Sequence, residues 1–251
     1  MGRLTRDKLG FSGPGWSPLY PAPPHFYRNT ENLLFFYETD LDPVLDLLPE
    51  EVEPSQENPI VMLWFQHAPF STFGPHQGCY GYIECVFRGE KYLYMPYLWV
   101  TSDSALAAGR ELWGDAKKLA DIKINIANEE IVATLERPTG VRLITARLRV
   151  EGFASPDDLG LTTPGLCIKM IPGVEQSDQP AILQLVEDAM TPHPVIGSDG
   201  RAEVFGGPAS VTFDSPSQLS PISNLVPRQM LRSYYALMHI DLDYGKVLKE
   251  L

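Results

Sequence analysis

The sequence predicts a β-rich domain of at least eight strands, arranged as a barrel or a sandwich, with a few helices packed on it. Short apolar and aromatic runs recur along the chain between turn residues. Of the 251 residues, 20 are Gly and 23 are Pro, which suits many turns better than a helical bundle. Hydrophobic residues make up 44% and charged residues 21%, so the chain is too apolar for disorder and can bury a large core.

The N-terminal part predicts an arm, a strand and a short helix. Residues 1–24 are expected to form an extended arm, because Gly, Pro and Ser are frequent in their second half. Such an arm either wraps its own body or reaches a neighbouring subunit. Residues 33–37 are an apolar run long enough for a buried strand, and residues 41–48 have helical spacing. No linker separates independent domains, so residues 1–251 are expected to form one domain.

Most of the remaining chain predicts strands. Residues 80–87 and 92–100 are rich in aromatic side chains and flank an Arg-Gly-Glu turn, so they predict a hairpin. The other runs are continuously apolar or alternate between apolar and polar residues. These further strands are expected at residues 60–65, 122–127, 131–135, 141–150, 166–171 and 209–213.

One helix is predicted among these strands, at residues 102–114. Ser102 and Asp103 supply an N-cap, good helix formers follow, and Gly114 ends the helix. Two weaker helices are predicted at residues 182–190 and 227–238. The sequence therefore predicts an α+β protein in which strands dominate.

The net charge and the cysteine content limit the binding partners and the cellular compartment that can be expected for the protein. A formal net charge of −12 argues against nucleic acid and against an anionic membrane surface as the main partner. The three cysteines, Cys79, Cys85 and Cys167, form no disulfide framework and are expected to be buried hydrophobes. No apolar signal segment and no run of 18 apolar residues is visible, so a cytoplasmic protein is expected.

Common catalytic and metal motifs are absent. The chain has no P-loop, no GxGxxG, no GxSxG and no HExxH. The five histidines are scattered without metal-ligand spacing. His67, His76 and Cys79 lie near one loop, but a hydrogen-bonded loop is favoured there over a metal site, and no metal is expected.

The pair Lys117-Lys118 is the most informative chemical feature. It follows the alanine-rich helix directly, and Trp113 and Leu119 flank it with apolar bulk. If the loop is buried, lost hydration and the neighbouring charge both favour a neutral amine. A neutral lysine can attack a carbonyl and form a Schiff base, which acts as an electron sink. The alternative is that the pair is solvated surface.

Residues 104–120, SALAAGRELWGDAKKLA, resemble the signature segment of the acetoacetate decarboxylase-like superfamily. Shorter segments agree in order at residues 37–40, 82–84, 95–98, 168–172 and 241–248, so the resemblance extends from about residue 20 to the end. It implies a mostly antiparallel, cone-shaped β-barrel with a few flanking helices. Lysine activation by a cationic neighbour is known from acetoacetate decarboxylase, so the activation of Lys117 by Lys118 is an implication of the resemblance.

The resemblance also implies roles for particular residues. Lys117 matches the Schiff-base lysine, and Lys118 matches the second lysine, which is expected to help lower the pKa of Lys117. The alternative is that only Lys117 enters the pocket and burial alone lowers its pKa. Glu84 matches an active-site glutamate that could act as general acid or base. The alternative for Glu84 is a strand carboxylate that faces solvent.

Departures from the family pattern affect the expected reaction. Thr30 stands where decarboxylating members have an arginine that binds the substrate carboxylate, and Arg28, two residues away, could replace it from the same strand face. Trp64 stands where the decarboxylase pocket has an acidic residue. Asp115 and Ala116 precede the lysine pair where an aromatic-Pro pair is usual, and a nearby Asp115 would favour the charged lysine.

These departures predict an enzyme that keeps imine chemistry and alters the handling of the carboxylate. The expected substrate is a small 2-oxo acid, which undergoes pyruvate aldol condensation and dehydration, or hydration of an unsaturated acid. The alternatives are an acetoacetate decarboxylase and a non-enzymatic barrel that binds a small ligand. No metal or organic cofactor is implied.

Further residues are candidates for binding the substrate. A keto acid requires a locally positive pocket, and Lys117, Lys118 and Arg28 are the expected cations. The expected additional contacts are Trp64, Gln66, Tyr82, Tyr97 and Tyr244. Superfamily members are homo-oligomers, so a homo-oligomer is expected here too.

Overall fold

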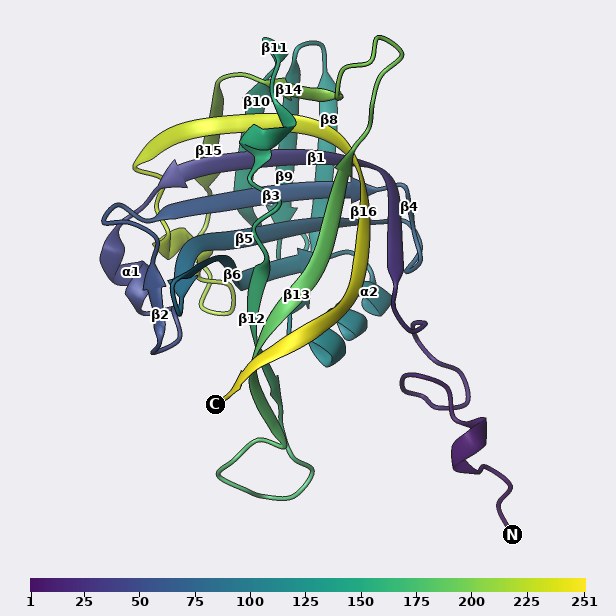
Figure 1. The fold of residues 1–251 in the computed structure, drawn as a ribbon. Coiled ribbons are helices and arrows are strands. Elements are labelled where there is room, and N and C mark those ends of the chain that lie inside the picture. The colour runs from purple at the N-terminus through teal and green to yellow at the C-terminus, as the bar shows by residue number, and fades with distance from the viewer.

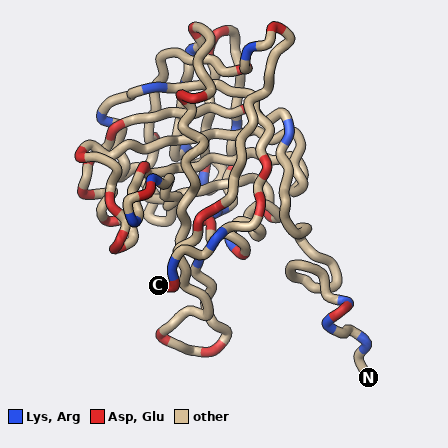
Figure 2. The backbone as a smooth tube through the Cα atoms, in the orientation of Figure 1, with Lys and Arg blue, Asp and Glu red and all other residues tan.

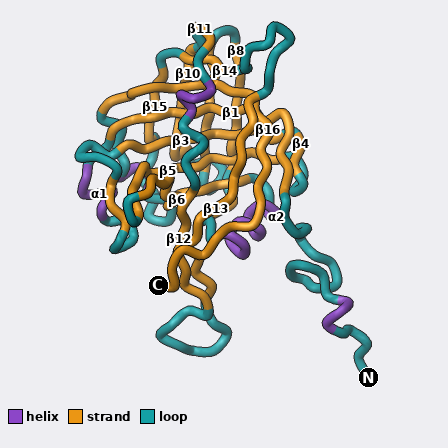
Figure 3. Tube along the Cα trace, in the orientation of Figure 1, coloured by secondary structure: helices purple, strands orange, loops and turns teal.

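The computed structural model describes residues 1–251, and strands dominate it (Figure 1, Figure 3). The largest sheet closes on itself, because β16 pairs with both β13 and β1. Pairing within this ring is antiparallel except between β12 and β6. The strands of the ring are β1 (His25–Glu38), β3 (Ile60–Ala68), β5 (His76–Phe87), β6 (Glu90–Val100), β12 (Gly165–Ile171), β13 (Ile182–Pro194) and β16 (Gln229–Glu250).

Short strands and helices complete the ring, and a second sheet covers part of it. Short strands extend the large sheet at β2 (Val52–Pro54), β4 (Phe70–Ser71), β7 (Lys117–Leu119), β11 (Gly152–Phe153) and β14 (Val204–Gly206). The second sheet contains β8 (Asp121–Ala127), β9 (Glu130–Glu136), β10 (Arg142–Arg149) and β15 (Ala209–Phe213). The helical segments are α1 (Leu41–Leu45), α2 (Asp103–Ala108), a π-helical turn (Gly109–Trp113) and three 3₁₀ turns (Arg6–Lys8, Pro156–Leu159, Ile222–Asn224).

Strand alternation divides the core into two layers. In β1, Leu33 and Phe35 pack in the layer shared with the second sheet, whereas Leu34 and Phe36 face the inside of the ring. The same alternation runs through β3, β5 and β6, because successive side chains of a strand point to opposite faces. Figure 1 shows β12, β13 and the lower part of β16 in front of this interior and β1, β3, β5 and β6 behind it. A side chain therefore reaches the interior only at every second position.

The predicted fold class is confirmed, including the closed, cone-like sheet with few helices. Each predicted strand is found, and only the one predicted at residues 141–150 extends beyond the observed strand, by one residue at each end. The helix at residues 102–114 is also found: the Ser102 hydroxyl accepts the Ala105 N–H at 3.3 Å, and Gly114 ends the π-helical turn with φ 84°. Helix α1 is shorter than predicted and ends at Leu45.

The two weaker helix predictions are wrong. Residues 182–190 lie in β13 and residues 227–238 lie mostly in β16. These two strands pair with each other, and β16 also pairs with β1 along most of its length. Pairing across the ring is non-local, so it overrides the local helical spacing of apolar residues.

The N-terminal arm precedes the ring and extends away from it. Residues 1–24 precede β1 and run away from the body in Figure 1. Tyr20 ties the arm to the body, because its side chain is buried and its hydroxyl donates to Glu111 at 2.6 Å. Asp and Glu positions are spread over many segments of the backbone rather than confined to one part of it (Figure 2). None of the helices has the length and apolar character that crossing a membrane would require.

Candidate active site

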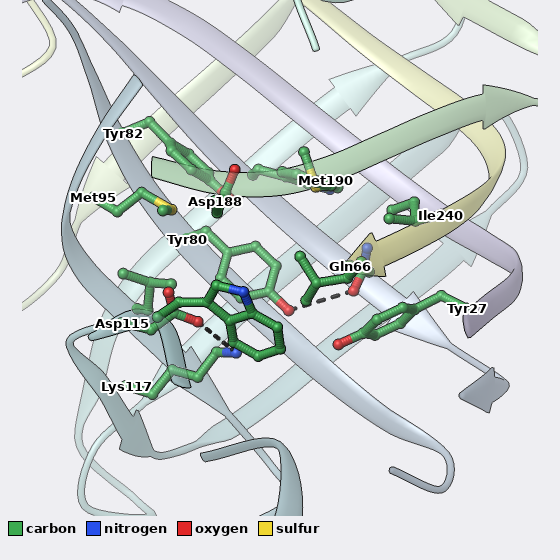
Figure 4. Close-up of a pocket in the computed structure, with 14 residues that line it drawn as sticks. Tyr27, Gln66, Tyr80, Tyr82, Met95, Asp115, Lys117, Asp188, Met190 and Ile240 are labelled. Atoms are coloured by element: carbon green, nitrogen blue, oxygen red, sulfur yellow. Dashed lines mark hydrogen bonds and ion pairs between the residues drawn. The ribbon is translucent and has the colours of Figure 1, made fainter. Parts of the chain in front are cut away.

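A small cavity inside the ring contains the lysine that the sequence singled out (Figure 4). Its free volume is about 50 Å³, so it admits only a small molecule. Ten of its 14 lining residues are hydrophobic, which makes the few polar groups decisive for chemistry. The lining residues are Tyr27, Trp64, Gln66, Tyr80, Tyr82, Met95, Leu98, Trp113, Asp115, Lys117, Asp188, Met190, Ile240 and Leu242.

Lys117 enters the cavity and Lys118 does not. The short strand β7 pairs in parallel with β6, so that Lys117 lies opposite Leu98, whose side chain also lines the cavity. Adjacent strand residues face opposite ways, and the Lys118 ammonium donates instead to the Leu219 carbonyl. Burial, together with Arg137 and Arg110, lowers the pKa of Lys118. The expectation that Lys118 faces the pocket beside Lys117 is therefore wrong.

The partner of Lys117 is a carboxylate rather than a second lysine. Lys117 Nζ lies 2.8 Å from Asp115 Oδ2, and the two residues are only 7% and 8% exposed. Burial alone would lower the pKa of Lys117, but the ion pair with Asp115 outweighs it, and the pKa is raised above its usual value. The resting lysine is therefore an ammonium, as the sequence indicated for a nearby Asp115.

Gly109 makes this ion pair possible. A Cβ at position 109 would lie 2.6 Å from Lys117 Nζ and 2.7 Å from Asp115 Oδ2, closer than any side chain can approach. The backbone N–H of Asp115 also donates to the Gly109 carbonyl at 3.0 Å. Gly109 therefore provides the surface against which Lys117 and its counter-ion Asp115 pack.

Asp188 is a cavity residue that the sequence did not reveal. It lies on β13, and its carboxylate accepts the Gly165 N–H at 3.0 Å. Burial and then the charge of Asp115 raise its pKa to about 6, although backbone N–H donors and Lys117 lower it. Alternation through Val186, Asp188 and Met190 would have placed Asp188 inside, but this segment was interpreted as a helix.

Three of the predicted substrate contacts line the cavity: Trp64, Gln66 and Tyr82. Two of them are held by Asn32, whose Oδ1 accepts the Trp64 indole N–H at 3.0 Å and the Gln66 amide at 3.2 Å. The Gln66 carbonyl accepts the Tyr80 hydroxyl at 3.3 Å. Gln66 is thus already satisfied by the protein and stiffens the cavity wall.

Two tyrosine hydroxyls remain available to a bound molecule. Those of Tyr27 and Tyr82 line the cavity and make no hydrogen bond to the protein. Burial raises the pKa of Tyr27 to about 12 and that of Tyr82 well above its usual range, so both hydroxyls keep their protons. Both can therefore donate to a carbonyl or carboxylate oxygen.

Glu84 lies outside the lysine cavity, contrary to the expectation that it acts beside the imine. It follows Tyr82 by two residues toward the outer end of β5 and lines a separate cavity with Lys91 and Arg232. Its carboxylate lies 3.6 Å from Arg232. Partial burial raises the pKa of Glu84, with Arg232 acting in the opposite direction. Strand position, rather than side-chain direction, separates Glu84 from Lys117.

Arg28 also fails to reach the cavity. The register of β1 shifts between Tyr27 and Thr30, and Asn29 adopts a φ of 54°, so the alternation expected from Thr30 to Arg28 is broken. Arg28 instead lies 2.7 Å from Asp241 at the surface. Thr30 is fully buried and donates to the Met238 carbonyl at 2.9 Å.

The two remaining tyrosine candidates lie elsewhere too. Tyr97 belongs to the opposite face of β6, where its ring stacks on Trp99 at 6.0 Å and its hydroxyl points at Pro221. Tyr244 is 56% exposed in the outer part of β16. Neither position is consistent with direct contact to a molecule held by Lys117.

Lys117 is the only cation that lines the cavity. His25 and His76 lie in the neighbouring aromatic cluster, and burial lowers the pKa of each to about 4, so both are neutral near pH 7. The locally positive pocket expected for a keto acid is therefore absent: one lysine faces two carboxylates, Asp115 and Asp188. No group of three or more His, Cys, Asp or Glu has a geometry that could hold a metal ion.

The structure is thus that of a closed-sheet protein in which the amine of one buried lysine faces a small apolar cavity. Comparison with known proteins identifies the family. The acetoacetate decarboxylase (ADC) family matches residues 10–251, and the chain belongs to this family. Acetoacetate decarboxylase 2 of Mesorhizobium japonicum is 32% identical over 100% of this chain and 93% of its own length. The chain is an enzyme of the lyase class.

Solved structures share the fold. The acetoacetate decarboxylase of Legionella pneumophila aligns with a TM-score of 0.85 and 25% identity over 97% of this chain and 94% of its own. The enduracididine biosynthesis enzyme MppR, in complex with pyruvate, aligns with a TM-score of 0.76 and 17% identity over 96% of this chain and 98% of its own.

Proposed function

We propose that the chain is an imine-forming lyase in which Lys117 Nζ attacks the carbonyl carbon of a small keto acid. The observation that carries this proposal is the position of Lys117, a buried lysine whose amine faces an apolar cavity inside the ring. A protonated imine accepts an electron pair from the adjacent bond, so it allows that bond to break. The relatives that cover the full chain support the same chemistry.

Asp115 is the proposed acceptor of the proton that Lys117 must lose before it attacks. The 2.8 Å distance allows direct transfer from the ammonium to the carboxylate. The resulting neutral pair is favoured by the apolar surroundings once a substrate has displaced solvent. After attack, the protonated imine has the same charge as the ammonium had, and Asp115 can pair with it.

The proposed reaction is loss of carbon dioxide from a β-keto acid. The imine nitrogen takes up the electrons of the breaking bond, and the enamine that forms then needs one proton on carbon. Two observations support this choice: curated relatives with 27–32% identity over the whole chain are acetoacetate decarboxylases, and the cavity wall beside the lysine is apolar. An apolar wall disfavours a carboxylate more than the dispersed charge of the transition state.

The second candidate is a lyase of 2-oxo acids that acts by aldol condensation and dehydration. It needs a base for the carbon acid as well as an acid, and the presence of two carboxylates in the cavity favours it. Trp64 in the place of an acidic residue of the decarboxylases also favours it. The two candidates differ in whether carbon dioxide leaves.

Borohydride trapping tests the proposal. The full chain is incubated with acetoacetate or pyruvate, reduced, digested and analysed by mass spectrometry, and an adduct on Lys117 is expected. Lys117→Ala should abolish the adduct, whereas Lys118→Ala, a matched change at the next residue, should retain it. Absence of any adduct, or an adduct on Lys118, contradicts the proposal. Carbon dioxide release from acetoacetate then selects the decarboxylase, and its absence with trapped pyruvate selects the second candidate.

A further inference from the structure

The charges that line the cavity oppose the entry of an anionic keto acid. Lys117 is already neutralised by Asp115 at 2.8 Å, and the same cavity holds a second carboxylate on Asp188. Arg28 and Lys118 are directed elsewhere. A keto acid that enters as an anion therefore brings a third negative charge to one positive charge in an apolar space, which is costly.

Asp188 is the group that can remove the excess charge. Asp115 is committed to Lys117 and also accepts the Cys167 thiol at 3.3 Å, whereas Asp188 has no cationic partner. The charged and titratable groups that face Asp188 are Asp115 just before β7, Lys117 on β7, Tyr82 on β5 and Cys167 on β12. Because Lys117 is the only cation among them, a new anion nearby can be accommodated if Asp188 takes up a proton.

We propose that a keto acid enters this cavity together with one proton, which Asp188 holds and then gives to the substrate carbon. This inference rests on the proposed imine chemistry and deepens it. A resting pKa of about 6 supports it, because Asp188 is then largely ionised at neutral pH and is readily protonated when a further negative charge approaches. Its proton donor role is distinct from the role of Asp115, which exchanges a proton with the amine.

The proton balance of the reaction agrees with this assignment. The Lys117 ammonium and the ketone form a protonated imine and water, with no net uptake of a proton. The carbon–carbon bond to the carboxylate breaks, carbon dioxide leaves, and the electron pair forms a neutral enamine. The O–H bond of Asp188 then breaks and its proton moves to the enamine carbon, which restores the protonated imine. Water releases the ketone and the ammonium, so the reaction consumes the one proton that entered with the substrate.

A matched pair of ketones tests the proposal on the full chain. Pyruvate and 3-methyl-2-butanone have the same number and arrangement of non-hydrogen atoms, but only pyruvate is charged. Binding is measured calorimetrically at pH 8 in two buffers of different ionisation enthalpy, which gives the number of protons taken up. We expect about one proton for pyruvate and none for the uncharged ketone, with pyruvate affinity falling about tenfold per pH unit above pH 7.

Variants identify the proton acceptor. In Asp188→Asn we expect no proton uptake with pyruvate, a retained Lys117 adduct, and acetoacetate turnover reduced at least about 100-fold. Glu187→Gln is the matched control on the same strand, because Glu187 faces away and accepts the Tyr92 hydroxyl at 3.0 Å. This control should keep the proton uptake.

The outcomes separate this inference from the proposed function. Equal proton uptake with both ketones in the unaltered chain, or uptake that persists in Asp188→Asn, overturns the role of Asp188 even if Lys117 is trapped. Absence of an adduct on Lys117 with either ketone overturns the imine chemistry itself. If Asp188→Asn fails to fold, equal proton uptake with the two ketones in the unaltered chain still overturns the proposal.

Discussion

Replacing Asp115 by Asn tests whether this carboxylate keeps Lys117 protonated. At 2.8 Å and an effective dielectric constant of about 20, the attraction between the two charges is about 6 kcal/mol. That energy corresponds to about four powers of ten in the balance between ammonium and amine. Asparagine keeps the size but removes the charge, so burial is left as the main influence and lowers the pKa of Lys117.

The assay is the rate of borohydride trapping as a function of pH, with the uncharged ketone 3-methyl-2-butanone so that Asp188 does not contribute. We expect the fraction of the maximal rate reached at pH 7 to rise at least about 100-fold in Asp115→Asn. Asp199→Asn, which removes an exposed carboxylate paired with Arg201, should leave the profile unchanged. A profile for Asp115→Asn that coincides with that of the unaltered chain would refute the reasoning.

Unfolding measurements add an independent check on Asp115→Asn. The pKa of Lys117 is raised in the folded chain, so the ion pair stabilises the fold at pH values below the ordinary lysine pKa and is lost as the pH rises through the raised value. Breaking a buried pair costs about 3–5 kcal/mol if the remaining charge persists. A markedly smaller loss at pH 7 indicates that Lys117 has released its proton.

Three further predictions concern other parts of the structure. Gly109→Ala should abolish trapping of Lys117, because the added carbon would displace the ammonium at 2.6 Å. Glu84→Gln should leave trapping unchanged and alter unfolding by less than about 1 kcal/mol, because Glu84 lies in another cavity in a partly exposed ion pair. His25 and His76 have pKa values near 4, below those of the unfolded chain, so below about pH 6.5 the unfolded state binds more protons. Replacing both with Gln should reduce the loss of stability between pH 6 and 5 by about 2–3 kcal/mol, measured by urea unfolding.

The glycine and histidine predictions each have a control variant. Gly152→Ala adds a methyl group where no atom lies within 4 Å, so it should preserve trapping and show that Gly109 acts through its contacts. His193→Gln makes the same substitution at an exposed histidine and controls for the change of side chain. Retained trapping in Gly109→Ala, slowed trapping in Glu84→Gln, or an unchanged acid slope in the double histidine variant would each contradict the corresponding assignment.

The sequence by itself determined the fold class and singled out the lysine that enters the cavity. Strand periodicity is a local property, since alternation and turn residues are read within a few positions. It located β1, β3, β5, β6, β8, β9, β10, β12 and β15, but not the short strands β2, β4 and β7. The small residues before Lys117 and the apolar residues around it indicated close packing at this loop. The nearby Asp115 was also visible in the sequence, two residues before the lysine.

Only the tertiary structure decided which side chains meet Lys117. Asp188 is distant in sequence and reaches the cavity because β13 closes the ring opposite β5, a pairing that helical spacing obscured. Arg28 is excluded by one irregularity in β1, and Lys118 by strand alternation. Which charged groups surround the cavity depends on long-range strand pairing and on single register shifts. The position of Lys117, in contrast, depends mainly on the short segment that contains it. This is why the sequence alone singled out the lysine that lies in the cavity, but predicted the groups around it only in part.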